Sequence, residues 1–149
     1  MTYFGKSLVF NGTHAFIGAP GEANEGSVYV YYYNYCRGQF EFLQKIIPST
    51  RSRQWFGASL SLVDDFLFVG APYNSDNDPS NYEQNNGKVY IYSTENFGET
   101  QTILNSNLTS YPYKYAKFGS SLSATDNFML VGESIGDEKA PFGRVSTEK

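Results

Sequence analysis

The sequence predicts an all-β fold in which one four-stranded antiparallel sheet is repeated along the chain. The first observation is a repeated spacing of 14 residues: the segments 4–18, 56–70 and 118–132 each open with a Phe-Gly pair and close on a glycine. The second is that short alternating or continuously apolar runs, bounded by turn residues, fill each segment. A repeat of about 50 residues predicts an array of stacked sheets rather than one globular core.

The first half of each repeat predicts a β-hairpin. Residues 59–62 alternate in polarity, Asp64-Asp65 interrupts them, and residues 66–69 are continuously apolar. We therefore expect two strands joined by a tight turn, with the second strand buried on both faces. Equivalent turns are expected at Asn11-Gly12 in the first copy and at Asp126-Asn127 in the third, because these residue types accept the positive φ of a hairpin turn.

Small residues end the second strand of each repeat. Gly70 and Ala71 have almost no side chain, which suits a place where a neighbouring sheet comes close, and Pro72 stops strand pairing. After the variable loop, Gly87 immediately precedes the third strand. We expect a valine at Gly70 to be more disruptive than an alanine at Gly87, because only Gly70 is predicted to lie where sheets meet.

Third and fourth strands complete each repeat. Residues 89–92 and their counterpart 28–31 alternate aliphatic with aromatic side chains, which predicts a third strand covered on both faces. Residues 40–47 and 100–104 have the mixed polarity of an outer edge strand. Four antiparallel strands per repeat describe the blade of a propeller. The expected blades are approximately 3–50, 55–106 and, incomplete, 117–149.

The paired motifs Phe-Gly and Gly-Ala-Pro resemble the FG-GAP repeat of integrin α-subunit propellers and related surface proteins. The resemblance implies a partial β-propeller, with two complete blades and most of a third, that serves as a non-enzymatic scaffold for adhesion or ligand recognition outside the cell. In the third copy Glu133-Ser134 replaces Ala-Pro. The matching residues are Phe4, Gly5, Gly18, Ala19, Pro20, Phe56, Gly57, Gly70, Ala71, Pro72, Phe118, Gly119 and Gly132.

Two loops of variable length are expected at one end of the blades, over residues 73–86 and 105–117. They combine tyrosine with asparagine and serine, a mixture that recognition loops use, because tyrosine offers a large contact area at a small entropic cost. The competing interpretation is that tyrosine is simply abundant, with 13 in the chain. The candidate residues for a protein or glycan ligand are Tyr73, Asn74, Asp76, Asp78, Tyr82, Tyr111, Tyr113 and Tyr115.

Few residues are candidates for other chemistry. Many relatives carry a calcium loop between the Phe-Gly and Gly-Ala-Pro strands, whereas only a tight turn fits here, so we expect no metal and no cofactor. The alternating oxygen ligands at 74–78 lack the glycine and the closing acid of a calcium loop. A single cysteine, Cys36, and a single histidine, His14, supply neither a disulfide nor a catalytic triad. Asn107 fits the glycosylation pattern in the more accessible of two such triplets.

The bulk composition restricts the class of partner. A net charge of −4 with scattered Lys and Arg argues against nucleic acid, and no apolar run is long enough to span a membrane. We expect no signal peptide in this chain and interpret it as a piece of a longer array, which would supply the remaining blades as partners. One alternative is that the chain is part of a propeller-fold enzyme, such as a hydrolase or lyase. The other is that it is a truncated product without a role of its own.

Bare apolar faces are expected at the two ends of such an array. We expect Phe4, Phe16 and Tyr29 on one of them, and on the other Phe118, Phe128 and Leu130. Exposed apolar faces of this kind predict that the chain alone is marginally stable and associates through them.

Overall fold

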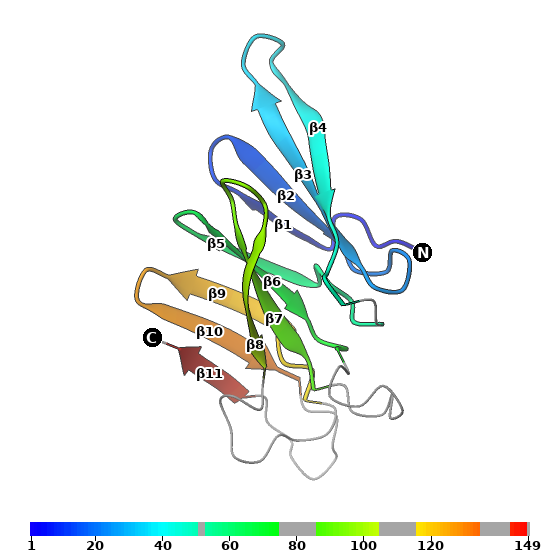
Figure 1. The fold of residues 1–149 in the computed structure, drawn as a ribbon, viewed down its shortest axis with the longest axis vertical. Helices are drawn as coiled ribbons and strands as arrows, with labels where there is room; N and C mark the ends of the chain where they lie inside the picture. The colour runs from blue at the N-terminus through cyan, green and yellow to red at the C-terminus, as the bar shows by residue number, and fades with distance from the viewer. Residues whose placement is uncertain (51–52, 75–85, 105–115, 135–143, 149) are drawn as a thin grey trace.

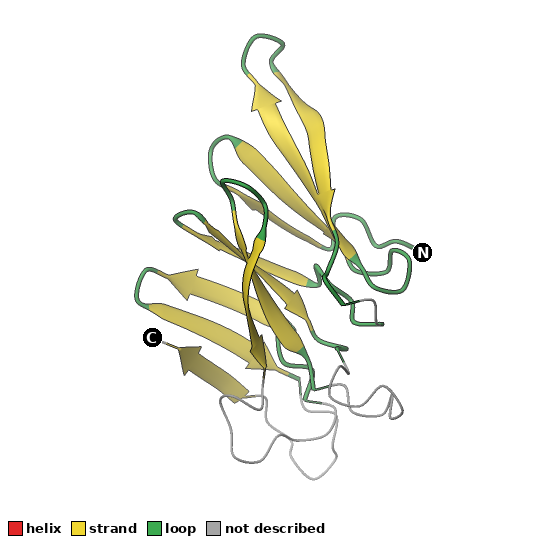
Figure 2. Ribbon diagram, viewed as in Figure 1, coloured by secondary structure: helices red, strands yellow, loops and turns green. Residues whose placement is uncertain are grey.

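The computed structural model is an all-β fold, with no helix among the residues it describes (Figures 1 and 2). Within the described part of the chain, eleven strands form three antiparallel sheets that stand side by side in chain order. The described residues are 1–50, 53–74, 86–104, 116–134 and 144–148.

The first two sheets have four strands each, and in both the strand order follows the chain. The predicted hairpins, third strands and outer edge strands are all confirmed. The first sheet comprises β1 (Ser7–Phe10), β2 (His14–Ala19), β3 (Ser27–Asn34) and β4 (Gln39–Ile46). The second comprises β5 (Ser59–Val63), β6 (Phe66–Ala71), β7 (Lys88–Ser93) and β8 (Glu99–Leu104).

The third sheet has three described strands in the order β11-β10-β9. Its strands are β9 (Ser121–Thr125), β10 (Phe128–Glu133) and β11 (Arg144–Glu148). Strand register shows that the three sheets repeat one geometry, because the same serine of the Phe-Gly-x-Ser motif pairs with the same glycine in each copy. The pairs are Ser7 with Gly18, Ser59 with Gly70, and Ser121 with Gly132.

The hydrophobic core lies between the sheets. One cluster joins the first sheet to the second and includes Phe16 and Phe56, and another joins the second to the third and includes Phe118. The expectation that Phe16 and Phe118 line the bare end faces is therefore wrong, because each side chain is fully buried against a neighbouring sheet. Phe16 points from β2 to the opposite face from the one expected, and Phe118, which precedes β9, packs against the second sheet.

The second strand of the hairpin is not buried on both faces as predicted. In β6, Leu67 and Val69 are fully buried, but Phe68 is only partly buried and Phe66 is 45% exposed. Phe66 pairs with Val63 next to the hairpin turn. The continuous apolar run therefore overstates the burial at this end of the strand.

Glycines bring the backbones of adjacent sheets together, as expected for Gly70. A Cβ placed on Gly70 would overlap the carbonyl oxygen of Gly119 and the Oγ of Ser59. Gly87, however, has a φ of +78°, and a Cβ there would overlap the backbone of Phe118. The premise that only Gly70 lies where sheets meet is therefore wrong, because Gly87 also lies at a sheet-to-sheet contact.

Candidate functional site

The residue before each Phe-Gly pair occupies the same unusual conformation in all three repeats. Tyr3, Trp55 and Lys117 have φ values of +53°, +58° and +49°, in the left-handed region. In each copy the carbonyl of this residue accepts a hydrogen bond of 3.1 Å from the amide three residues later. Because the turn recurs, successive repeats present this side chain at corresponding places, at the end of the sheets where the variable loops were predicted.

These side chains form a continuous row with Tyr73, which follows β6. The ring centroids of Tyr3 and Trp55 lie 5.7 Å apart, and those of Trp55 and Tyr73 lie 4.8 Å apart. The Nζ atom of Lys117 lies 5.3 Å from the centre of the Tyr73 ring, a cation–π contact. We call Tyr3, Trp55, Tyr73 and Lys117 the aromatic row.

The side chains of the aromatic row are partly accessible. Tyr3 is 46% exposed, while Trp55, Tyr73 and Lys117 are half-buried. Aromatic faces supply large contact area with little loss of side-chain freedom, and the hydroxyl and ammonium groups add hydrogen-bond donors. The row can therefore stack on a sugar ring or an apolar peptide side chain while its polar groups fix the orientation.

A buried polar network holds the centre of the row. Gln54 is fully buried, and its Oε1 accepts hydrogen bonds from Asn74 Nδ2 at 2.6 Å and from the Tyr90 hydroxyl at 2.7 Å. The Gln54 carbonyl also accepts a bond of 3.1 Å from the amide of Tyr73. Gln54 and Asn74 directly neighbour Trp55 and Tyr73 in the chain. The network therefore fixes the backbone from which the side chains of Trp55 and Tyr73 extend.

This network changes the interpretation of Asn74. Its side chain is only 3% exposed and points to Gln54, so it anchors the start of the loop instead of facing a ligand. Tyr73 is partly accessible, and its role in ligand binding stays a prediction. The other candidates, Asp76, Asp78, Tyr82, Tyr111, Tyr113 and Tyr115, lie outside the described residues, as does Asn107.

Three members of the row escaped the sequence analysis. Tyr3 and Trp55 lie outside the predicted variable loops, and Lys117 is the last residue of the loop 105–117 but was not among its candidate residues. Their shared position immediately before Phe-Gly was the available signal, because a repeated position in a stacked array falls on one surface. The contacts of Tyr73 with Trp55 and with Lys117 of the next repeat are evident only from the packing of neighbouring sheets.

The shorter loop of the first sheet, between β2 and β3, is tied to the strands by Glu22. Its carboxylate accepts hydrogen bonds from Ser27, from the Tyr29 hydroxyl at 2.8 Å and from Lys45 Nζ at 3.2 Å. Burial raises the pKa of Glu22, but these bonds outweigh it and hold the pKa below its ordinary value of 4.5. The same bonds raise the pKa of Tyr29 and of Lys45.

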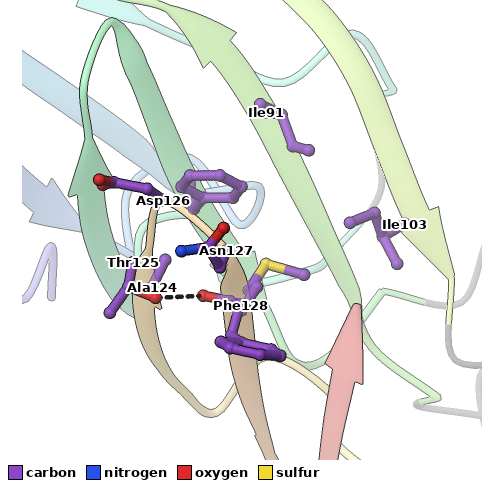
Figure 3. A pocket seen from close by; sticks show the side chains of 9 residues that line it. Ile91, Ile103, Ala124, Thr125, Asp126, Asn127 and Phe128 are labelled. Carbon is purple, nitrogen blue, oxygen red and sulfur yellow. Dashed lines mark hydrogen bonds between the residues drawn. The ribbon is translucent and has the colours of Figure 1, made fainter. Parts of the chain in front are cut away.

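A small pocket lies at the opposite end of the sheets, beside the turn between β9 and β10 (Figure 3). Its volume is about 170 Å³, and apolar side chains such as Phe68, Ile91 and Ile103 form one wall. Asp126 is the one acidic residue in its lining, which contains no basic residue. The lining therefore offers no pair of titratable groups for acid–base chemistry.

Among the described residues, no group of three or more His, Cys, Asp or Glu side chains is placed to hold a metal ion. In the same part of the chain, no helix is long and apolar enough to cross a membrane.

One family model matches the middle part of the chain. The family model of the FG-GAP repeat matches residues 40–92, which confirms the resemblance drawn from the motifs for this segment. The matched segment runs from β4 of the first sheet through β7 of the second, so it includes one crossing between sheets and the Phe56-Gly57 pair. No curated protein matches the chain.

Proposed function

We propose that this chain is part of a non-enzymatic β-propeller that recognises a protein or glycan ligand outside the cell. The observation that carries the proposal is the aromatic row, in which one position of each of three repeats contributes to a single surface. The FG-GAP match supports a propeller-type binding scaffold. In such a scaffold the sheets act as rigid blades, and the row with its adjoining loops makes the contact.

The row favours a ligand with flat or apolar surfaces. The Gln54 network fixes the backbone at Trp55 and Tyr73, and the two rings already contact each other, so little freedom is lost on binding. Lys117 adds one positive charge beside the Tyr73 ring. Sugar rings, and peptides with proline or aromatic residues, both suit this combination of stacking and hydrogen bonding.

The test is a binding screen on an oligosaccharide array and a displayed peptide library, followed by substitution. We expect Tyr73→Ala and Trp55→Ala each to weaken binding of the selected ligand at least about tenfold, as removal of an aromatic anchor does. Tyr35→Ala is the matched control, because Tyr35 is an aromatic residue that is 72% exposed at the distant turn between β3 and β4. Thermal melts check that each variant folds.

Two results would overturn the proposal. One is the absence of binding in both screens by a folded preparation. The other is a selected ligand whose affinity is unchanged by Tyr73→Ala and Trp55→Ala but is lost with Tyr35→Ala, which would place recognition on the other end of the sheets.

A further inference from the structure

The two contacts between sheets are built in the same way. The Oγ of Ser7 donates a hydrogen bond of 2.7 Å to the carbonyl of Gly57, and the Oγ of Ser59 donates one of 2.7 Å to the carbonyl of Gly119. In both cases a Phe-Gly pair of one sheet fits against a serine and a glycine of the sheet before it. We call residues 3–5, 55–57 and 117–119 the Phe-Gly corners. The seats that receive them are Ser7 with Gly18, Ser59 with Gly70 and Ser121 with Gly132.

The third seat has the geometry of the other two but receives no corner among the described residues. A Cβ placed on Gly132 would overlap Ser121 Oγ, as a Cβ on Gly70 would overlap Ser59 Oγ. Gly70 also faces the carbonyl of Gly119, whereas the atoms found next to Gly132 all belong to Ser121. The serine hydroxyl is therefore already directed to the place where a carbonyl would lie.

Apolar side chains beside this seat are uncovered. Phe128 is 50% exposed and Leu130 is 44% exposed. Phe68, the counterpart of Leu130 in the second sheet, packs against the apolar cluster that also contains Phe118. The face of the third sheet is thus the receiving half of an interface that the chain already uses twice.

The first corner is the complementary half and is also uncovered. Phe4 is 51% exposed, whereas Phe56 and Phe118 are fully buried. No other heavy atom lies within 4 Å of a Cβ placed on Gly5, but Ser27 and Gly18 lie that close to one placed on Gly57. Leu8, which follows this corner, is 61% exposed.

This corner is nevertheless already folded for docking. Gly5 has a φ of +86°, close to the +89° of both Gly57 and Gly119. Its amide donates a hydrogen bond of 3.0 Å to the Gly18 carbonyl, as the amide of Gly57 does to the Gly70 carbonyl at 3.1 Å. Hydrogen bonds within its own sheet already fix the conformation of the corner, so docking costs little further conformational entropy.

We propose that a second copy of this chain docks its first corner, residues 3–5, on the third seat at Ser121 and Gly132. The Ser121 hydroxyl donates to the Gly5 carbonyl of the second copy, and Phe4 packs beside Leu130. Such a contact joins different surfaces of the two copies, so it is head-to-tail and repeats from copy to copy until a ring closes.

The test is sedimentation velocity of the purified chain from about 1 to 200 µM, a range that includes moderate protein affinities. We expect the mass to rise with concentration, and Phe4→Glu or Leu130→Glu each to raise the dissociation constant at least about tenfold. Tyr35→Glu is the matched control for an acidic residue at an exposed aromatic position and should leave association unchanged. Ser121→Ala weakens the contact without introducing a charge, and circular dichroism checks that each variant folds.

Mixing distinguishes a head-to-tail contact from non-specific association. Phe4→Glu keeps an intact seat and Leu130→Glu keeps an intact corner, so the two variants together restore one wild-type contact. We expect an equimolar mixture to associate at least about tenfold more tightly than either variant alone and to stop at a heterodimer. A chain that stays monomeric across the range overturns the proposal, as does association that persists in both variants.

Discussion

At the scale of single residues, glycine is required wherever one sheet's backbone touches the next. Gly87 shows this most clearly, because it combines a φ of +78° with direct contact to the Phe118 backbone. Gly26, its counterpart in the first sheet, has a φ of +90° and faces Phe56 in the same way. Both glycines form an isolated bridge to the Phe of the following corner. The third strand therefore begins at a contact between sheets.

We predict that Gly87→Ala lowers the free energy of unfolding by about 2–4 kcal/mol, because backbone strain and overpacking act together. Gly12→Ala is the control, since Gly12 has a φ of +97° but open space around it. It should cost only about 1 kcal/mol, the strain alone. Urea unfolding measures both, and equal losses would show that Gly87 is not at a tight contact.

At the scale of elements, Glu22 ties the loop between β2 and β3 to both adjoining strands, through Tyr29 on β3 and Lys45 on β4. A carboxylate with a pKa below its unfolded value favours the folded state whenever it is ionised. Its contribution is complete above pH 4.5 and is lost as the pH falls through the lower folded value.

We predict that Glu22→Gln lowers stability at pH 7 by no more than about 1 kcal/mol, because solvent screens this partly exposed group. The difference from the wild type should shrink as the pH falls below 4.5 and vanish once the pH is below the lowered pKa of the folded state, where the wild-type carboxylate is protonated. Unfolding measured across this range tests the prediction, with Glu95→Gln at an exposed turn as the control. A difference that grows on acidification would contradict it.

At the scale of the whole molecule, stability is distributed over the contacts between successive sheets. Ser7, Ser59 and Ser121 occupy one repeated position, yet their neighbours differ. Ser59 is buried against the Gly119 carbonyl, Ser7 reaches the Gly57 carbonyl at a partly exposed site, and Ser121 is exposed. Replacing each of the three serines by alanine therefore separates the role of the serine within its own sheet from its role in the contact with the next sheet.

We predict that Ser59→Ala costs about 1–3 kcal/mol, since it leaves a buried carbonyl without its donor. Ser7→Ala should cost about 0.5–1.5 kcal/mol, the net value of an ordinary hydrogen bond. Ser121→Ala should be nearly neutral at concentrations where the chain is monomeric. Guanidinium unfolding of the three variants gives the ranking, and an equal loss at Ser121 would mean that the serine acts within its own sheet.

The sequence by itself determined the repeat, the strands, the hairpin turns and the sheet order. Each of these depends on neighbours in the chain: alternation along residues 59–62, turn residues at Asp64-Asp65, and mixed polarity in the edge strand 40–47. The FG-GAP motif was recognisable for the same reason, because its glycines and phenylalanines recur at one spacing. Local pattern is enough for features that local interactions produce.

Only the tertiary structure decided which faces are covered. Phe16 and Phe118 were assigned to open ends and are buried, and Asn74 was assigned to a binding loop and points inward to Gln54. The aromatic row and the tight contact at Gly87 likewise depend on packing against the adjacent sheet. Residues from adjacent repeats meet there although they lie tens of positions apart in the chain, as Ser59 and Gly119 do. No pattern within one repeat contains that contact, so the packing of the sheets had to supply it.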